Sequence, residues 1–201
     1  MSADAARHAL IAGLVPEGAR VLDVGCGDGA LLARLQADRG ARAYGLEIDP
    51  GAVARAVGRG LSVVQGNADT DLGSYPDRAF GVVVLSNSLQ ALRRPLPVLR
   101  RAVRVGERVV VAFPNFGHWR VRASLVRTGR MPRSRALPAL WYETDNIHLC
   151  TVLDFLDLAR AEGWTVHEAH GVAGGRSWRF DPARPAAANL RAQEAVFCVA
   201  A

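Results

Sequence analysis

The chain has 201 residues, of which 50% are hydrophobic and 22% are charged, and its formal net charge is +6 because 25 arginines, with no lysine, outnumber 19 acidic residues. This composition excludes a low-complexity or collagen-like chain and leaves enough apolar residues for one folded domain. No apolar run reaches the roughly 18 residues of a membrane span, and the N-terminus lacks a secretory signal. We therefore expect a soluble, cytoplasmic protein with no membrane contact.

Strands and helices are predicted to alternate along the first half of the chain. Buried strands are expected at 21–24, 41–49, 61–66, 80–86 and 108–113, and two closing strands at 164–173 and 194–201. Helices are expected at 5–14, from residue 30, at 51–57 and at 96–103. Near-continuous apolar strands that alternate with helices indicate a mostly parallel sheet covered on both faces. The predicted fold class is therefore α/β, Rossmann-like, with helices on both faces of the sheet.

The second half of the chain has weaker periodicity. Residues 114–149, rich in Pro, Arg and Trp, are expected to form an irregular insertion, and a connection of that length is usually functional. Thr151 and Asp154 have the spacing of a capping box and predict a helix start. The Gly/Arg/Pro/Ala-rich segment 174–193 is expected to be a flexible connection between the last two strands. We expect a single domain over residues 1–201.

The cysteines and histidines indicate no metal site. Cys26, Cys150 and Cys198 have no C-x-x-C spacing, which fits neither a disulfide framework nor a zinc site. The five histidines form no metal-ligand pattern either. We therefore expect no metal and interpret the cysteines as small buried hydrophobic residues.

The clearest chemistry lies between the first strand and the first helix, where the sequence reads Asp23-Val-Gly-Cys-Gly-Asp-Gly29. Glycines allow a sharp turn and a close approach of a ligand to the backbone, and the following helix N-terminus offers unpaired N–H groups. Glu47 ends the next strand, where a carboxylate can accept both hydrogens of a ribose diol. The two features predict a nucleoside site at the carboxyl ends of the strands.

The charge of the loop favours one class of nucleoside ligand. The glycines also satisfy the dinucleotide fingerprint G-x-G-x-x-G/A, so their spacing alone does not identify the ligand. Asp23 and Asp28 flank the loop, and no arginine lies between Arg20 and Arg34, so a pyrophosphate would meet carboxylates at close range. S-adenosylmethionine has no phosphate and carries a sulfonium and an ammonium group. We therefore favour S-adenosylmethionine, with a dinucleotide or a purely structural glycine turn as the alternatives.

Six blocks carry a resemblance to a known family: VLDVGCGDGALLARL (21–35), YGLEID (44–49), VVLSNSLQAL (83–92), FPNFGHWRVR (113–122), GRMPRSRALP (129–138) and WYETDNIHLCT (141–151). The first two resemble the opening motifs of class I S-adenosylmethionine-dependent methyltransferases. More narrowly, residues 20–170 resemble the methionine biosynthesis protein MetW family, and the last three blocks are unusual outside it. The resemblance implies a seven-stranded methyltransferase-like fold and a partnership with homoserine O-acyltransferase (MetX), which acylates homoserine early in methionine synthesis.

The resemblance also implies which residues bind S-adenosylmethionine or S-adenosylhomocysteine. It places the methionine part at the glycine loop, the ribose at Glu47 and the adenine at the end of the third strand. The implied cofactor-binding residues are Asp23, Gly25, Cys26, Gly27, Gly29, Glu47, Ile48, Asn67, Ala68 and Ser86. Two positions depart from the family pattern, since Asn67 stands where an acid is common and Gly81 where Asp is frequent.

A catalytic base is not evident, and we assign no catalytic residue. Methyl transfer to oxygen or an amine normally benefits from a nearby base, but the sequence after the fourth strand, Ser86 to Gln90, contains no His, Asp or Glu. His118 and His148 are the remaining candidates, with a structural role as the alternative. Together with this lack of a base, the resemblance to the MetW family implies an accessory or regulatory subunit that supports or regulates homoserine acylation. An active methyltransferase on a small molecule, with 114–149 as its lid, is the alternative.

The positive charge is concentrated in one segment. Residues 93–135 hold 12 arginines and one acid, whereas the flanking segments are slightly acidic. Arginine, tryptophan and tyrosine together are typical of protein interfaces, so we expect a docking surface for MetX over residues 120–141. Its candidate residues are Trp119, Arg120, Arg130, Arg135, Trp141 and Tyr142. Binding of nucleic acid through the same arginines is the alternative.

Overall fold

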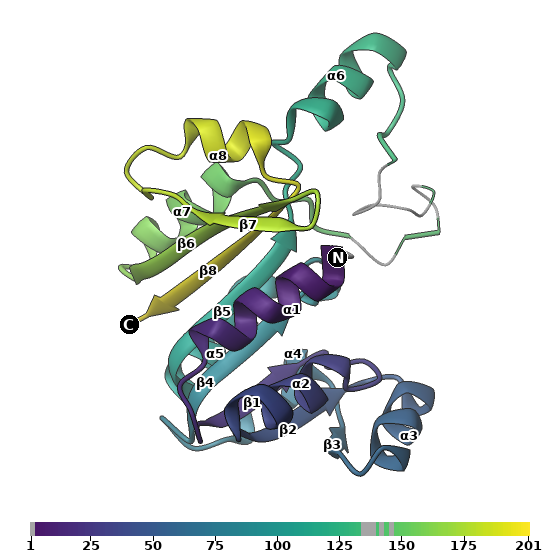
Figure 1. Ribbon diagram of the computed structural model, residues 1–201, viewed down its shortest axis with the longest axis vertical. Helices are drawn as coiled ribbons and strands as arrows, with labels where there is room; N and C mark the ends of the chain where they lie inside the picture. The colour runs from purple at the N-terminus through teal and green to yellow at the C-terminus, as the bar shows by residue number, and fades with distance from the viewer. Residues whose placement is uncertain (1–2, 134–139, 141–142, 145–146) are drawn as a thin grey trace.

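A computed structural model describes residues 3–133, 140, 143–144 and 147–201 of the chain. Its centre is an eight-stranded sheet with the strand order β3-β2-β1-β4-β5-β8-β6-β7 (Figure 1). The strands are β1 (Arg20–Val24), β2 (Arg42–Glu47), β3 (Ser62–Gln65), β4 (Phe80–Ser86), β5 (Gly106–Pro114), β6 (Thr165–Ala173), β7 (Arg176–Arg179) and β8 (Glu194–Ala200). The α-helices are α1 (Ala3–Leu14), α2 (Ala30–Arg39), α3 (Pro50–Gly58), α4 (Ala68–Asp71), α5 (Pro95–Val105), α6 (Trp119–Thr128), α7 (Val152–Ala161) and α8 (Ala186–Arg191), and the 3-10 turns are η1 (Leu72–Ser74) and η2 (Leu89–Ala91).

The first five strands form the parallel half of the sheet, and β8, β6 and β7 add antiparallel pairs at one side. Successive residues of a strand point to opposite faces, so Val82 and Val84 of β4 pack with α1 and α2, whereas Val83 and Leu85 pack with α5 and α7. Both faces are therefore buried, which explains the continuous apolar runs. The predicted α/β class with a mostly parallel sheet is confirmed.

The expected strand count of seven is wrong by one, because the segment 174–193 contains β7 and α8 instead of only a flexible connection. Strand β7 pairs antiparallel with β6 from His170 opposite Arg179 to Ala173 opposite Arg176. Gly174 and Gly175 both have positive φ, 58° and 75°, which is the backbone that a two-residue hairpin turn requires. The Gly-Gly pair therefore closes a hairpin.

The stretch 114–149, expected to be irregular, contains the helix α6. The side chain of His118 caps its N-terminus by accepting a hydrogen bond from the backbone N–H of Arg120 at 3.2 Å. Gly129 ends the helix with a φ of 62°, the left-handed conformation that terminates many helices. Helix α6 stands away from the sheet at one end of the molecule (Figure 1), and Val121 is its one buried residue. None of the helices among the described residues is long and apolar enough to cross a membrane.

Candidate cofactor-binding site

A cavity of about 410 Å³ lies at the carboxyl ends of the parallel strands. The strand order reverses between β1 and β4, and in open α/β sheets ligands bind at such a point. A volume of this size lies within the roughly 300–1,000 Å³ typical of small-molecule sites. Five of the predicted cofactor-binding residues line the cavity, namely Gly25, Glu47, Ile48, Asn67 and Ala68. Asp23, Cys26, Gly27, Gly29 and Ser86 do not line it and lie in its supporting structure.

The glycine loop brings its backbone close to the neighbouring strand ends. Gly25 has a φ of 75° and donates its N–H to the carbonyl of Leu46 at 2.7 Å. A Cβ added to Gly25 would lie 2.6 Å from Cβ of Ser88, which no side chain tolerates without movement. Cys26 is 8% exposed and packs against Gly45, and burial raises the pKa of its thiol to about 12. Cys26 is therefore an inert packing residue beneath the loop.

Glu47 joins the end of β2 to the glycine loop. Its Oε2 accepts a hydrogen bond from the N–H of Gly27 at 2.7 Å, and its Oε1 accepts from Ile48 at 2.8 Å and Asp49 at 3.0 Å. A carboxylate has about four acceptor sites, so one remains for a ligand hydroxyl. The predicted juxtaposition of the loop and this carboxylate is present in the structure.

Asp23 lies buried under the loop, with 2% of its surface exposed. Its Oδ1 has no hydrogen-bond partner. Burial and the nearby charge of Glu47 raise the pKa of Asp23 to about 7, although Arg7 acts in the opposite direction. A buried carboxylate that lacks a partner is costly, and a ligand cation or N–H donor near it would lower that cost.

Unpaired buried polar atoms are concentrated around this site. Of the six such side-chain atoms in the part of the chain that the structure describes, five belong to Asp23, Asn87, Ser88 and Gln90. Asp23 lies near the end of β1, the other three residues follow β4, and Asn87 also has a positive φ of 58°. Buried polar atoms are normally satisfied, and clustered exceptions indicate a missing polar partner. These unpaired atoms therefore fit a polar ligand. Asn87 and Ser88 line the cavity, and neither was among the predicted cofactor-binding residues.

Asn67 and Asp69 shape the adenine end of the predicted site. The side chain of Asn67 caps α4 by accepting from the N–H of Asp69 at 2.9 Å. The Asp69 carboxylate in turn accepts from the backbone N–H groups of Arg93 at 3.1 Å and Arg94 at 2.9 Å. These contacts hold the chain after η2 against the chain after β3, and both segments line the cavity.

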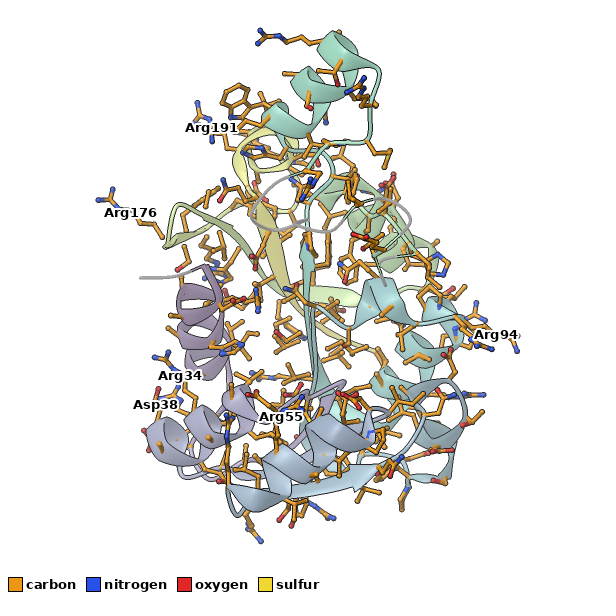
Figure 2. The ribbon with its side chains drawn as sticks, turned by 90° about the vertical axis from the view of Figure 1, so that its right-hand side faces the viewer. Arg34, Asp38, Arg55, Arg94, Arg176 and Arg191 are labelled. Carbon is orange, nitrogen blue, oxygen red and sulfur yellow. The ribbon has the colours of Figure 1, made fainter. Side chains whose placement is uncertain are left out.

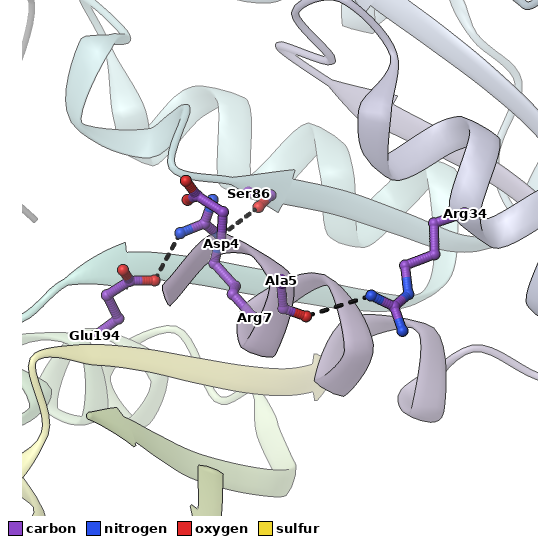
Figure 3. A network of polar contacts seen from close by, with 6 residues as sticks. All are labelled: Asp4, Ala5, Arg7, Arg34, Ser86 and Glu194. Atoms are coloured by element: carbon purple, nitrogen blue, oxygen red, sulfur yellow. Dashed lines mark hydrogen bonds and ion pairs between the residues drawn. The ribbon is translucent and has the colours of Figure 1, made fainter. Parts of the chain in front are cut away.

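Ser86 lies beside a buried ion pair that was not predicted (Figure 3). Its hydroxyl accepts a hydrogen bond from Nε of Arg7 at 3.2 Å, and Nη1 of Arg7 contacts Oε2 of Glu194 at 2.7 Å. Arg7 is 5% exposed and Glu194 is 3% exposed. Helix α1 is thereby tied to the ends of β4 and β8. No local pattern marks these partners, because they lie 187 positions apart.

The two candidate bases lie outside the cavity lining. His118 accepts at Nδ1 as the cap of α6, and burial and the charge of Arg120 lower its pKa, which keeps the imidazole neutral for this role. His148 is exposed, and its backbone N–H donates to the carbonyl of Gln90 at 3.1 Å. No group of three or more His, Cys, Asp or Glu side chains that could hold a metal occurs among the described residues.

The candidate docking residues divide into two groups. Trp119 and Arg120 begin α6, and Arg130 follows its last turn. Trp119 is 49% exposed, and the guanidinium of Arg120 lies 5.2 Å from the centre of its ring. Arg135, Trp141 and Tyr142 lie outside the described residues.

The sheet order, the glycine loop and the carboxylate at the end of β2 define a protein with the class I methyltransferase fold, and solved structures share it. A methyltransferase from Thermotoga maritima, described as a possible histamine N-methyltransferase, has a TM-score of 0.70 at 15% identity, over 97% of this chain and 87% of that one. An S-adenosylmethionine-dependent methyltransferase from Mesorhizobium loti has a TM-score of 0.68 at 20% identity, over 98% and 99% of the two chains. At these identities the likeness establishes the fold alone.

The chain belongs to the MetW family, because the family model of methionine biosynthesis protein MetW matches residues 5–199. A similar protein is the bifunctional methionine biosynthesis protein MetXA/MetW of Rhodopirellula baltica, which is 31% identical over 155 residues. That match covers 72% of this chain and 25% of the relative, so the chain corresponds to about a quarter of the fused protein. The predicted family is confirmed.

Proposed function

We propose that this protein binds S-adenosylmethionine or S-adenosylhomocysteine in the cavity at the strand ends and associates with homoserine O-acyltransferase (MetX) to support or regulate homoserine acylation. The observation that carries the ligand proposal is the unpaired, buried Oδ1 of Asp23 beneath a glycine loop that is joined to Glu47. A sulfonium ligand with an ammonium group supplies the positive charge that these two carboxylates lack.

Three parts of the ligand have matching groups in this chain. Gly25 lines the cavity at the glycine loop, Glu47 has an acceptor site left for a ribose hydroxyl, and Asn67 and Ala68 line the part of the cavity at the end of β3. The hydrogen bonds that Glu47 accepts come from backbone N–H groups, and the Oδ1 of Asp23 has no partner. Arg59 pairs with Asp28 of the loop at 3.0 Å, and Arg93 lines the cavity. The Asp23 and Glu47 carboxylates therefore favour a cationic group over a pyrophosphate at their end of the cavity.

The partner proposal is supported by the fused relative, in which a MetXA part and a MetW part share one chain. Proteins that are fused in one organism often work together as separate chains in another. Of the two candidate bases, His118 caps helix α6 and His148 lies exposed. This arrangement favours an accessory role over catalysis of methyl transfer.

Calorimetric titration with S-adenosylmethionine and S-adenosylhomocysteine tests the ligand proposal. We expect binding to wild type and roughly 10- to 100-fold weaker binding to Asp23→Asn and Glu47→Gln, because hydrogen bonds to charged groups are worth about 1.5–3 kcal/mol. Asp38→Asn is the matched control, since Asp38 is an exposed carboxylate on α2 (Figure 2) and should leave binding unchanged. Absence of heat with wild type, or equal binding by all variants, would refute the ligand proposal.

A further inference from the structure

Helix α6 exposes large apolar side chains, which are usually buried in folded proteins. Trp119 is 49% exposed and Val126 is 86% exposed, whereas Val121 is buried. Trp119, Ala123 and Val126 follow the i, i+4, i+7 spacing, so they share one face of the helix, about opposite Val121. An exposed apolar face of this kind marks an interaction site.

Arginines flank this apolar face, and acids are missing near it. Arg120 and Arg127 are seven positions apart and therefore form the next row along α6. No Asp or Glu occurs between Glu107 and Glu143 in the sequence, so nothing on the helix neutralises the row. We define the docking face as Trp119, Ala123 and Val126 with Arg120 and Arg127. Its charge complements a partner surface that carries carboxylates around an apolar cleft.

The chain that leads into α6 is anchored by Asn115, which is 2% exposed. Its Nδ2 donates to the carbonyls of Asn189 at 2.7 Å and Ala192 at 2.8 Å, and its Oδ1 accepts from the N–H groups of Gly117 at 2.9 Å and Val152 at 3.2 Å. Both polar atoms of the Asn115 side chain therefore form two hydrogen bonds each, at the junction between β5, α6, α7 and α8. A pre-organised helix loses little entropy on binding.

We propose that the docking face of α6 is the surface by which this protein binds homoserine O-acyltransferase, inserting Trp119 and Val126 into an apolar cleft whose rim carries carboxylates for Arg120 and Arg127. This inference rests on the proposed function, which supplies the partner. A protein partner fits better than nucleic acid, because the centre of the face is aliphatic and aromatic and its arginines lie at the edge. Tryptophan and arginine are also the residues that most often dominate binding energy at protein interfaces.

Affinities of purified variants for the purified cognate acyltransferase test the inference. We expect binding about tenfold or more weaker for Val126→Glu and for Arg127→Glu. Arg176→Glu makes the same charge reversal at a distant exposed position (Figure 2) and should change the affinity less than about twofold. Val126 is exposed, so these variants should keep the wild-type unfolding midpoint, which thermal denaturation checks.

The outcomes separate the inference from the proposed function. Binding of wild type and all variants with equal affinity would overturn the docking face and leave the proposed function intact. No binding of wild type would overturn both. Loss of single-stranded RNA binding in Arg127→Glu, with acyltransferase binding unchanged, would assign the face to nucleic acid and overturn the inference.

Discussion

Arg7 on α1 and Glu194 at the start of β8 form an ion pair at 2.7 Å in which both side chains are nearly fully buried (Figure 3). The pair joins the first helix to the last strand, and the Arg7 guanidinium also contacts Ser86 and Asp4. It lies close enough to Asp23 to lower the pKa of that carboxyl. Arg7 therefore both holds the first helix against the last strand and lowers the pKa of Asp23 in the site.

Replacing Arg7 with methionine should lower the free energy of unfolding by about 3–5 kcal/mol, because it leaves the charge of Glu194 buried and unpaired. The double variant with Glu194→Gln should recover part of this loss. Arg34→Met is the control (Figure 2), since Arg34 forms an i,i+4 pair with Asp38 at 2.9 Å and donates to the carbonyl of Ala5 at 3.3 Å. Together these contacts contribute about 1–2 kcal/mol. Urea denaturation measures all four proteins. Equal losses for Arg7→Met and Arg34→Met would contradict the prediction.

Asp23 should make the ligand-free protein less stable as pH rises. Its pKa is about 7 in the folded protein and 3.8 in the reference state, so the folded state keeps a proton that the unfolded state has lost between these values. Stability is therefore lost from about pH 4 to about pH 7. Asp23→Asn lacks this titration and should be more stable than wild type at about pH 8, with the difference shrinking toward about pH 4. Denaturation at several pH values checks this, and a pH-independent difference would exclude it.

Gly25→Ala should disrupt the site more than Gly18→Ala, although both substitutions introduce the same kind of backbone strain. Both Gly25 and Gly18 have positive φ, 75° and 67°, but an added Cβ meets Ser88 at 2.6 Å only at Gly25. Each variant should lose about 1–2 kcal/mol from the left-handed backbone, and Gly25→Ala should in addition lose ligand affinity. Paired denaturation and calorimetry measure the two effects. Unchanged ligand binding by Gly25→Ala would show that the loop geometry is not needed.

Ligand binding and docking should be coupled through the chain that returns from α6. The N–H groups of Ile147 and His148 donate to the carbonyl of Gln90 at 2.9 and 3.1 Å, and Ala91 and Leu92, which follow it, line the cavity. We expect the affinity for S-adenosylmethionine to differ by about fivefold or more between free protein and the acyltransferase complex, and coupling is reciprocal. Calorimetry with and without the partner measures it. Equal affinities for S-adenosylmethionine in the two states would show that ligand binding and docking are not coupled.

The sheet and the main part of the site could be predicted because local patterns encode them. The apolar runs of the parallel strands, the glycine loop and Glu47 each follow from a short stretch of sequence, and strand topology brings them together. The contribution of Arg7 could not be predicted, because its partner Glu194 lies at the other end of the chain and no local signal marks either residue.

Two elements were missed although their signals were present. Gly174-Gly175 is a hairpin signal, but the composition of the following residues suggested a flexible connection. The helix α6 has a glycine at its end and apolar residues at 119, 123 and 126, yet its cap is His118, which is not among the favoured N-cap residues. The Pro/Arg/Trp-rich composition of 114–149 therefore suggested an irregular stretch. Asn115 lies at the junction under α6 and contacts segments that are up to 77 positions away in the sequence, so no local pattern marks it.

The rate of homoserine acylation by the cognate acyltransferase, measured with and without this protein, tests the central claim most directly. We predict a changed rate on addition of the protein, a further change on addition of S-adenosylmethionine, and loss of the second change in Asp23→Asn. An unchanged acylation rate under all these conditions, together with separate elution of the two proteins, would contradict the account.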